Sequence, residues 1–256
     1  MSKFLVVGDV HGDFPFASAV CRTAASFGIT DIFQVGDFGV WDHLDEGVYF
    51  LDKLDENSEK RGANWTFVAG NHENYNSLEQ HALGMDDHGF VNLRKRIRWT
   101  GRTNVWNYNG LRMGAFGGAY SIDREMRTPG ISWWPQEMPT LADVYAFEAQ
   151  VGDERLDVLF SHDAPISLPE WNGFIKDDSQ SEASRRRVTD AYAVARPRIG
   201  LHGHYHRELT YTHEFSRVYG LGCNYEAQRY YGGPKQAPLA IVNTDDLSVK
   251  FINYVL

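Results

Sequence analysis

Short apolar runs that each end in a polar, glycine-containing turn recur along the chain, and they constrain its fold more than any other feature. Three of them are Phe4–Val7 before GDVHGD, Ile32–Val35 before GDFG and Trp65–Ala69 before GNHE. Runs of this length, bounded by turn residues, are typical of buried strands. The stretches Phe14–Phe27 and Leu44–Lys60 between them have helical character. This alternation of strand and helix predicts a layered α/β fold.

A second sheet is predicted by short alternating segments in the middle of the chain. These segments are Ile97–Thr100, Val105–Tyr108 and Leu111–Ala115. The dipeptide Asn109-Gly110 separates the last two, and it is a strong signal for a tight hairpin turn.

The C-terminal half continues the pattern with the strand-like runs Val158–Phe160 and Ile199–Leu201 and the helix-like stretch Ser181–Ala195. Residues 117–139 lack periodicity and are rich in glycine, proline and aromatic residues, which predicts a long functional loop. A chain of 256 residues is near the upper end for a single core. We therefore expect one domain over residues 1–256, with a loop insertion around 117–139.

The charge balance limits the partners that the chain can bind. The sequence has 25 Lys and Arg residues against 34 Asp and Glu residues. This acidic balance argues against binding of long duplex nucleic acid or of an anionic membrane, because both require clustered basic residues. A single nucleotide or a short one stays compatible with the composition. No apolar run approaches the ~20 residues that a membrane-spanning helix needs.

The cysteines and the first residues bear on the cellular compartment. Cys21 and Cys223 are too few for a disulfide framework, and the strand-like KFLVVGD follows Met1 without a basic, cleavable apolar segment. The sequence therefore predicts a cytoplasmic protein. Nothing in the composition indicates whether the chain forms oligomers.

Polar side chains gather at the ends of the predicted strands, where loops of open α/β sheets bind ligands. Seven of them are candidate metal ligands: Asp9, His11, Asp37, Asn71, His162, His204 and His206. Carboxylate and amide oxygens together with imidazoles, and without thiolates, fit two divalent ions such as manganese, iron or zinc better than a structural zinc site. A glycine precedes a candidate ligand at four places and permits a turn or a close backbone approach there, at Gly8, Gly36, Gly70 and Gly203.

These motifs, in this order, resemble the calcineurin-like metallophosphoesterase family. The resemblance rests on GDVHG at 8–12, GDFG at 36–39, GNHE at 70–73, the single His162, and GHYH at 203–206. Any one motif alone is weak, but five in the right order are specific. The resemblance implies a four-layered αββα sandwich with a dinuclear metal site at the strand ends.

The resemblance also implies roles for individual residues. It divides the ligands between two metals, with Asp9, His11 and His206 on the first, Asn71, His162 and His204 on the second, and Asp37 bridging both. His72 would face the substrate and assist the leaving oxygen, as an acid or by charge stabilisation. His202 falls outside the GH-x-H spacing, and we expect it to support the structure rather than to bind metal.

The chemistry expected of such a centre follows from its charge. Two cations roughly 3.5 to 4 Å apart lower the pKa of a shared water, so that a bridging hydroxide attacks phosphorus in line. Manganese is the first expectation for both ions, with iron, zinc or others as alternatives. No covalent phosphoenzyme is required.

The 117–139 segment has two interpretations. In the first it is a substrate wall, in which Arg124 or Arg127 grips phosphate and Trp133, Trp134 or Tyr120 stacks on a base. In the second the segment simply packs onto the body of the protein.

Departures from the sequence patterns of known subfamilies restrict the class of phosphoester that the chain is expected to hydrolyse. The protein phosphatases of this family carry GD-x-x-x-RG, whereas Val40, Trp41 and Asp42 follow GDFG here. The late GH-x-H pair, and the lack of room for a nuclease capping domain, favour a small phosphodiester. The overall resemblance is to compact bacterial and phage-encoded phosphodiesterases that act on cyclic nucleotides, including 2′,3′-cyclic ones, usually with manganese.

Other functions stay open at this level. A phosphomonoesterase or a protein phosphatase could use the same centre. A non-catalytic scaffold of this fold, such as a retromer subunit, is the alternative from another class, although His72 and every candidate ligand are present. Hydrolysis of a nucleotide-linked lipid would need an apolar entry, for which Trp133, Trp134 and Met138 are candidates.

Overall fold

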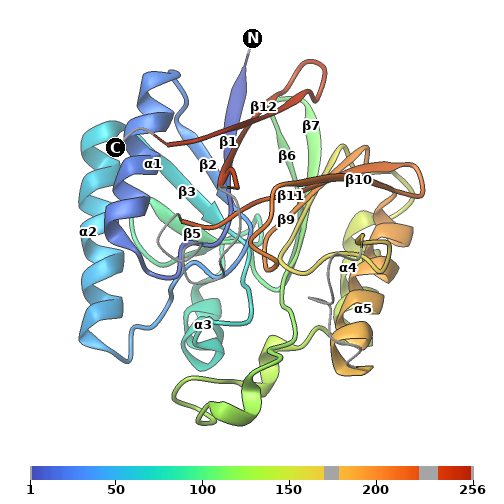
Figure 1. Ribbon diagram of the computed structural model, residues 1–256, viewed down its shortest axis with the longest axis horizontal. Coiled ribbons are helices and arrows are strands. Elements are labelled where there is room, and N and C mark those ends of the chain that lie inside the picture. Colours follow the sequence, from blue (N-terminus) through green and yellow to red (C-terminus); the bar gives the residue numbers. More distant parts are fainter. Residues whose placement is uncertain (1, 170–178, 225–235, 255–256) are drawn as a thin grey trace.

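The computed structural model describes residues 2–169, 179–224 and 236–254, in which two β-sheets lie between two layers of helices (Figure 1). The seven strands of the first sheet are β1 (Lys3–Val7), β2 (Asp31–Gln34), β3 (Asn64–Phe67), β4 (Val91–Asn92), β5 (Ile97–Trp99), β12 (Leu239–Asn243) and β13 (Val249–Ile252). Their order is β13-β12-β1-β2-β3-β5-β4. Neighbouring strands β1, β2, β3 and β5 are parallel, so their carboxyl ends lie on the same edge of the sheet.

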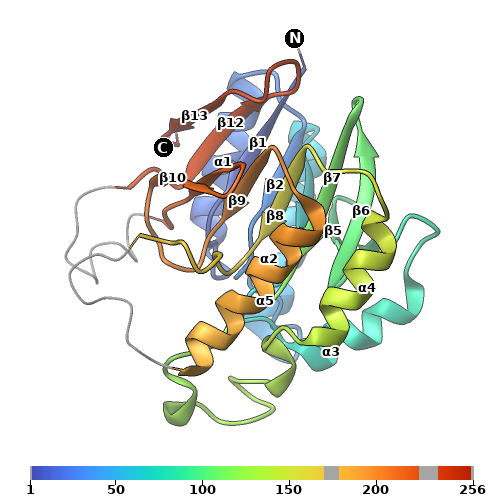
Figure 2. The same cartoon turned by 90° about the vertical axis from the view of Figure 1, so that its right-hand side faces the viewer.

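The second sheet contains β6 (Thr103–Tyr108), β7 (Leu111–Phe116), β8 (Val158–Ser161), β9 (Ile199–His202), β10 (Leu209–His213) and β11 (Ser216–Gly220). Their order is β10-β11-β9-β8-β7-β6. Strands β7, β8, β9 and β11 are parallel to one another. The two sheets face each other in the turned view (Figure 2).

The helices form the two outer layers. They are α1 (Phe14–Ser26), α2 (Asp45–Arg61), α3 (Tyr75–His81), α4 (Leu141–Val151) and α5 (Ser179–Ala195). α1 and α2 cover the first sheet, and α4 and α5 cover the second (Figure 1). The predicted four-layered αββα sandwich is therefore confirmed.

Side-chain alternation along β1 shows why the layers form. Leu5 and Val7 pack in the cluster beneath α1 and α2, whereas Phe4 and Val6 pack in the cluster between the two sheets. Successive side chains of a strand point to opposite faces, so a strand that is apolar on both faces needs a layer on each side. A third cluster, which includes Phe147 and Tyr192, joins the second sheet to α4 and α5.

Local sequence signals fix the ends of several helices. The Asp13 carboxylate accepts a hydrogen bond from the backbone N–H of Phe16 and so caps α1. Gly62 ends α2 in the left-handed conformation, with φ 68°. Helix α4 is not among the predicted helices, although Thr140 and Asp143 form a reciprocal capping box at its start.

One predicted segment lies in a different sheet from the one expected. The sequence pattern places Ile97–Thr100 in the second sheet, but β5 pairs with β3 in the first sheet, with Ile97 opposite Trp65. Ile97 and Trp99 are buried in the cluster beneath the first helical layer, and this burial decides the placement. The hairpin prediction is confirmed, because Asn109 and Gly110 join β6 to β7 with φ values of 48° and 81°.

Across residues 2–169, 179–224 and 236–254, the structure contains no helix with the length and apolar character needed to cross a membrane.

Candidate metal centre

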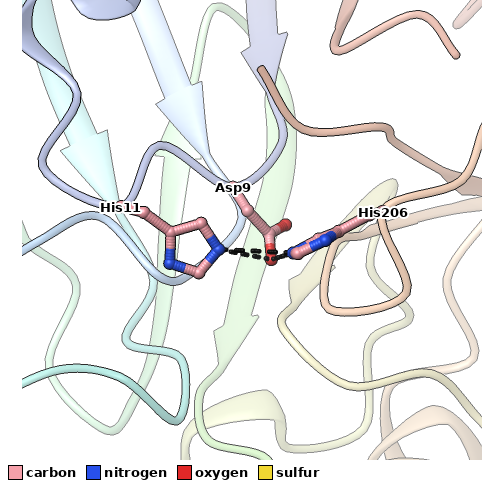
Figure 3. Close-up of side chains that lie close together, drawn as sticks. All are labelled: Asp9, His11 and His206. Atoms are coloured by element: carbon pink, nitrogen blue, oxygen red, sulfur yellow. Dashed lines mark hydrogen bonds and ion pairs between the residues drawn. The ribbon is translucent and has the colours of Figure 1, made fainter. Parts of the chain in front are cut away.

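The loop after β1 brings a buried carboxylate against a histidine from the far end of the chain. Asp9 is fully buried, and one of its oxygens, Oδ2, lies 3.0 Å from Nε2 of His206. Nε2 of His11 is 3.3 Å from the same nitrogen of His206 and 3.9 Å from Oδ2 of Asp9. Figure 3 shows the two rings on either side of the carboxylate. The three ligand atoms therefore converge on one point, as a divalent cation requires.

Asp37 follows β2 and lies between two groups of histidines. Its Oδ2 is 3.3 Å from Nε2 of His162, and 3.9 Å from Nε2 of His11 and of His72. Its Oδ1 accepts the backbone N–H of His72, which fixes the carboxylate in place. Burial alone would raise the pKa of Asp37, but the neighbouring imidazoles hold it well below its usual value. This position is the one expected of a ligand shared by two cations.

Asn71 and His162 form the other side of the centre. Oδ1 of Asn71 lies 3.0 Å from Nε2 of His162, and Nδ1 of His162 lies 2.8 Å from the carbonyl oxygen of Val35. Nε2 of His162 thus faces the oxygens of Asn71 and Asp37, neither of which can donate a proton when Asp37 is ionised. Burial would lower the pKa of His162, but Asp37 raises it to about 10. The site therefore attracts positive charge, which fits a bound metal cation.

His204 lies beside this group without joining the closest ligand atoms. Its ring centroid is 5.0 Å from that of His162, and its backbone N–H donates to Oδ1 of Asp9. Burial lowers the pKa of His204 to about 4, so the ring is neutral, as a metal ligand must be. Among the described residues, three groups could hold a metal ion; together they contain every predicted histidine ligand and carboxylate except His204, and one of them also includes His72.

Backbone strain marks the same loops. His11, Asp37, His204 and His206 all have positive φ, between 50° and 65°, which costs free energy for residues with a side chain. The close backbone approach predicted at Gly36 is present, since a Cβ there would lie 2.2 Å from Nδ1 of His162. The loops therefore hold their side chains in conformations that the chain would not adopt without the surrounding structure.

His72 lies at the rim of the centre and contacts an arginine of the 117–139 segment. Nη2 of Arg127 is 2.8 Å from Nε2 of His72, and Nη1 is 3.0 Å from Nδ1. A carboxylate oxygen of Asp123 accepts from the same Nη2 at 2.9 Å. Burial lowers the pKa of His72 and the Arg127 charge lowers it further, against the opposing effect of Asp37. His72 thus has the candidate ligand Asp37 on one side and the Arg127 guanidinium on the other.

Other predicted substrate residues make different contacts. The Arg124 guanidinium lies 5.0 Å above the ring of Tyr120, which is only 7% exposed. Trp134 is buried in the core cluster beneath the first helical layer, with its ring next to His43. The structure therefore places Arg127 against His72 and Arg124 over the ring of Tyr120.

The hydrogen bonds of His202 go to groups other than the candidate ligands. Its Nδ1 lies 3.0 Å from the carbonyl oxygen of Gly203, and its Nε2 lies 3.1 Å from the hydroxyl of Tyr211. Both ring nitrogens are therefore occupied by protein partners, which agrees with a structural role.

Glu73 is a site residue that the sequence reasoning missed. Its carboxylate is fully buried and accepts the backbone N–H groups of Gly39 and Gly70, so it ties together the loops that carry Asp37 and Asn71. Burial raises the pKa of Glu73 to about 7. The signal was available, because this glutamate is the last residue of the GNHE motif.

The four-layered fold and the cluster of carboxylates, imidazoles and an amide at its strand ends define a metal-dependent hydrolase of phosphate esters as the class of protein. The sequence matches the family model of the calcineurin-like phosphoesterases over residues 2–208. The chain belongs to this family, whose members use dinuclear metal centres.

Solved structures show the same fold at low sequence identity. The protein TT1561 of Thermus thermophilus is 12% identical with a TM-score of 0.64, and the match covers 98% of each chain. A dimetal phosphatase from Danio rerio is 13% identical with a TM-score of 0.56, and the match covers 99% of this chain and 98% of that one. Phosphopantetheinyl hydrolase from Mycobacterium tuberculosis is 17% identical with a TM-score of 0.53, with 96% and 98% covered. A comparison with curated proteins gives no significant match.

Proposed function

We propose that this protein is a metal-dependent phosphodiesterase that hydrolyses small phosphodiesters, with cyclic nucleotides, including 2′,3′-cyclic ones, as its substrate class. The observation that carries the proposal is the Arg127–His72 pair beside Asp37, which places an anion-binding cation against the candidate metal ligands. A phosphodiester carries one negative charge and needs fewer cationic partners than a monoester or a polyphosphate. Arg127 at the rim, whose charge Asp123 offsets in part, would meet that single negative charge.

The proposed metal ligands divide as the family resemblance implies. Asp9, His11 and His206 would hold one divalent ion, Asn71, His162 and His204 the other, and Asp37 both, with manganese proposed for each position. When bound, these ions would supply an activated water and neutralise the non-bridging phosphate oxygens. The oxygen and imidazole donors of the centre fit manganese, iron or zinc.

The protein's own groups would then position the ester. Arg127 would bind a non-bridging oxygen of the phosphate, and Asp123 would hold its guanidinium in place. As the family resemblance implies, His72 would donate a hydrogen bond or a proton to the leaving oxygen, and its ring lies between Arg127 and Asp37. The backbone bond from His72 to Asp37 would keep this ring at a fixed distance from the ligands.

The cellular setting that we propose is the cytoplasm, with a small soluble substrate. Cys21 and Cys223 are both buried and form no disulfide, which is compatible with a reducing compartment.

The testing experiment compares two chromogenic esters. The protein is stripped with a chelator, manganese is added back, and hydrolysis of bis-p-nitrophenyl phosphate is measured beside that of p-nitrophenyl phosphate, with His72→Ala as the control for contaminating activity. Manganese-dependent turnover that prefers the diester and is lost in the variant is the expected result.

The opposite results point to the alternatives. Preference for the monoester would replace the proposal with a phosphomonoesterase. If no divalent metal gives turnover of either ester, a cyclic-nucleotide panel decides between a selective enzyme and a non-catalytic scaffold.

A further inference from the structure

The two ends of the 117–139 segment meet behind Asn71. The carboxylate of Glu137 accepts the backbone N–H of Ser121 at 2.7 Å and the hydroxyl of Ser121 at 2.8 Å. The same hydroxyl oxygen accepts from Nδ2 of Asn71 at 2.9 Å. All three residues are 3% exposed or less. Glu137, Ser121 and Asn71 therefore form one buried chain of hydrogen bonds that ends at the candidate metal centre.

The chemistry of the three groups fixes the direction of this chain. With Glu137 ionised, as it is above the pKa of about 7 that burial gives it, its carboxylate can only accept, and a serine hydroxyl has a single proton. Since Ser121 donates that proton to Glu137, its oxygen must act as an acceptor toward Asn71. The partner of Ser121 is then Nδ2 of the amide, which leaves Oδ1 directed at Nε2 of His162, 3.0 Å away.

The opposite orientation of the Asn71 amide would turn its oxygen away from the metal position. With the amide rotated by half a turn, Nδ2 would face the centre, and an amide N–H₂ group does not bind a metal cation. In the metal-free protein, only the hydrogen-bond partners of the Asn71 amide can select between the two orientations, because the side chain carries no charge.

We infer that Glu137 and Ser121 are positioning residues, which hold the Asn71 amide with its oxygen toward the metal position that Asn71 shares with His162. The inference rests on the proposed metal-binding role of Asn71. It also gives residues 117–139 a second task, because the segment that carries Arg127 would set the geometry of a metal ligand.

The segment is built to hold Glu137 firmly. The Arg102 guanidinium donates to the carbonyl oxygens of Gln136 and Glu137 and lies over the ring of Tyr75. Tyr75 in turn donates its hydroxyl proton to the carbonyl oxygen of Gly70, the residue before Asn71. The carboxylate and the amide are thus anchored to the same framework.

The test measures metal binding rather than hydrolysis. Manganese is titrated calorimetrically into metal-free protein at a pH above the Glu137 pKa, so that the carboxylate is ionised, and the two binding steps are resolved for the wild type, Ser121→Ala, Glu137→Gln, their double variant and Asn71→Ala. Glu137→Gln keeps the shape but can donate to Ser121, which lets the hydroxyl donate to Asn71 and favours the rotated amide. Glu125→Gln, an exposed carboxylate in the same segment, is the matched control.

The expected result is selective. Ser121→Ala and Glu137→Gln should each weaken the step that Asn71→Ala removes by about 10- to 100-fold, while the other step stays close to wild type. The double variant should be no weaker than the worse single variant, because both changes break one chain. Glu125→Gln should bind like the wild type. Metal-free thermal unfolding is recorded for each protein, and Glu137→Gln should remain folded because its shape is conserved.

Three outcomes would overturn the inference. Wild-type affinity for both ions in Ser121→Ala and Glu137→Gln would refute it while leaving the proposed function intact. Equal weakening of both steps, together with a lower metal-free melting temperature, would show that the pair serves only the fold. Failure of the wild type to bind two ions would remove both the inference and the proposed dinuclear centre.

Discussion

Replacing Arg127 by alanine is the most direct test of how the rim of the centre binds the substrate. In the wild type the guanidinium contacts both ring nitrogens of His72 and is paired with Asp123 at 2.9 Å. Its side chain is 13% exposed, so water screens it only in part. The proposed phosphate contact therefore forms in a partly desolvated place, where a lost charged hydrogen bond has a measurable cost.

The size of the effect follows from this geometry. Hydrogen bonds to charged groups contribute about 1.5 to 3 kcal/mol. Because Asp123 neutralises part of the Arg127 charge, we expect the lower part of that range, about 1.5 to 2 kcal/mol, or about 10- to 30-fold in kcat/KM. Arg127→Lys keeps the charge but loses the planar fork, and it should lie between the wild type and the alanine variant.

The assay is manganese-dependent hydrolysis of bis-p-nitrophenyl phosphate, analysed as kcat and KM. Removal of Arg127 also leaves the Asp123 carboxylate facing an anionic substrate, and Arg127→Ala combined with Asp123→Asn separates this repulsion from the lost contact. Arg186→Ala is the control for a lost surface charge, since Arg186 pairs with Glu182 on the exposed side of α5.

Two results would contradict this reasoning. Activity of Arg127→Ala within about twofold of wild type would refute it, because a charged hydrogen bond contributes more than that. If Arg124→Ala loses activity and Arg127→Ala does not, the phosphate contact belongs to Arg124 rather than to Arg127.

Four further predictions concern the ligands, the leaving group and the fold. Asp37→Ala should lower the manganese content measured by mass spectrometry to less than two ions per chain and abolish turnover, since Asp37 faces both ligand groups. His72→Ala should keep its metals and lose about 100-fold or more in kcat on an ester with a poor leaving group; full turnover would show that the ring has no role at the leaving oxygen. Gly36→Ala should lose at least about 3 kcal/mol of unfolding free energy in urea melts, because φ is 99° and a Cβ would lie 2.2 Å from a ring nitrogen, whereas Gly84→Ala, with no atom within 4 Å, should be close to neutral. Burial raises the pKa of Glu137 to about 7 from a usual 4.5, so metal-free wild type should lose up to about 3 kcal/mol relative to Glu137→Gln as the pH rises through that interval. An unchanged difference between about pH 4.5 and pH 8 would contradict the last prediction.

The sequence contained most of the information about which residues meet at the centre. Asp9, Asp37 and Asn71 each follow a buried run that forms a strand of the first sheet, and His162 follows β8 of the second. Parallel strands in register place their carboxyl ends together, so residues far apart in the chain could be assigned to one site. The uninterrupted apolar run of β1, Phe4–Val7, likewise indicates burial on both faces of the sheet.

Other features could not be deduced, because they depend on contacts without a sequence period. A three-residue strand such as β5 has the same pattern in either sheet, and only the burial of Ile97 and Trp99 against the first helical layer decides between them. Glu137 lies 16 residues from Ser121 in a segment with no periodicity. Nothing in the sequence shows that these two residues share a hydrogen bond, or in which direction it runs.

Several features that lower the stability of this fold lie together at the candidate centre, and they support a functional role for it. Four candidate ligands adopt left-handed backbone conformations, and Glu137 is a buried carboxylate whose protonation would stabilise the fold. Each such feature lowers the stability of the metal-free protein, and a chain selected only for stability would replace them by glycine or by an apolar side chain. The same features direct oxygen and nitrogen atoms at the positions where cations would bind. Because Glu137→Gln would free the Asn71 amide to rotate and so weaken metal binding, the gain in melting temperature on adding manganese should be larger for the wild type than for Glu137→Gln.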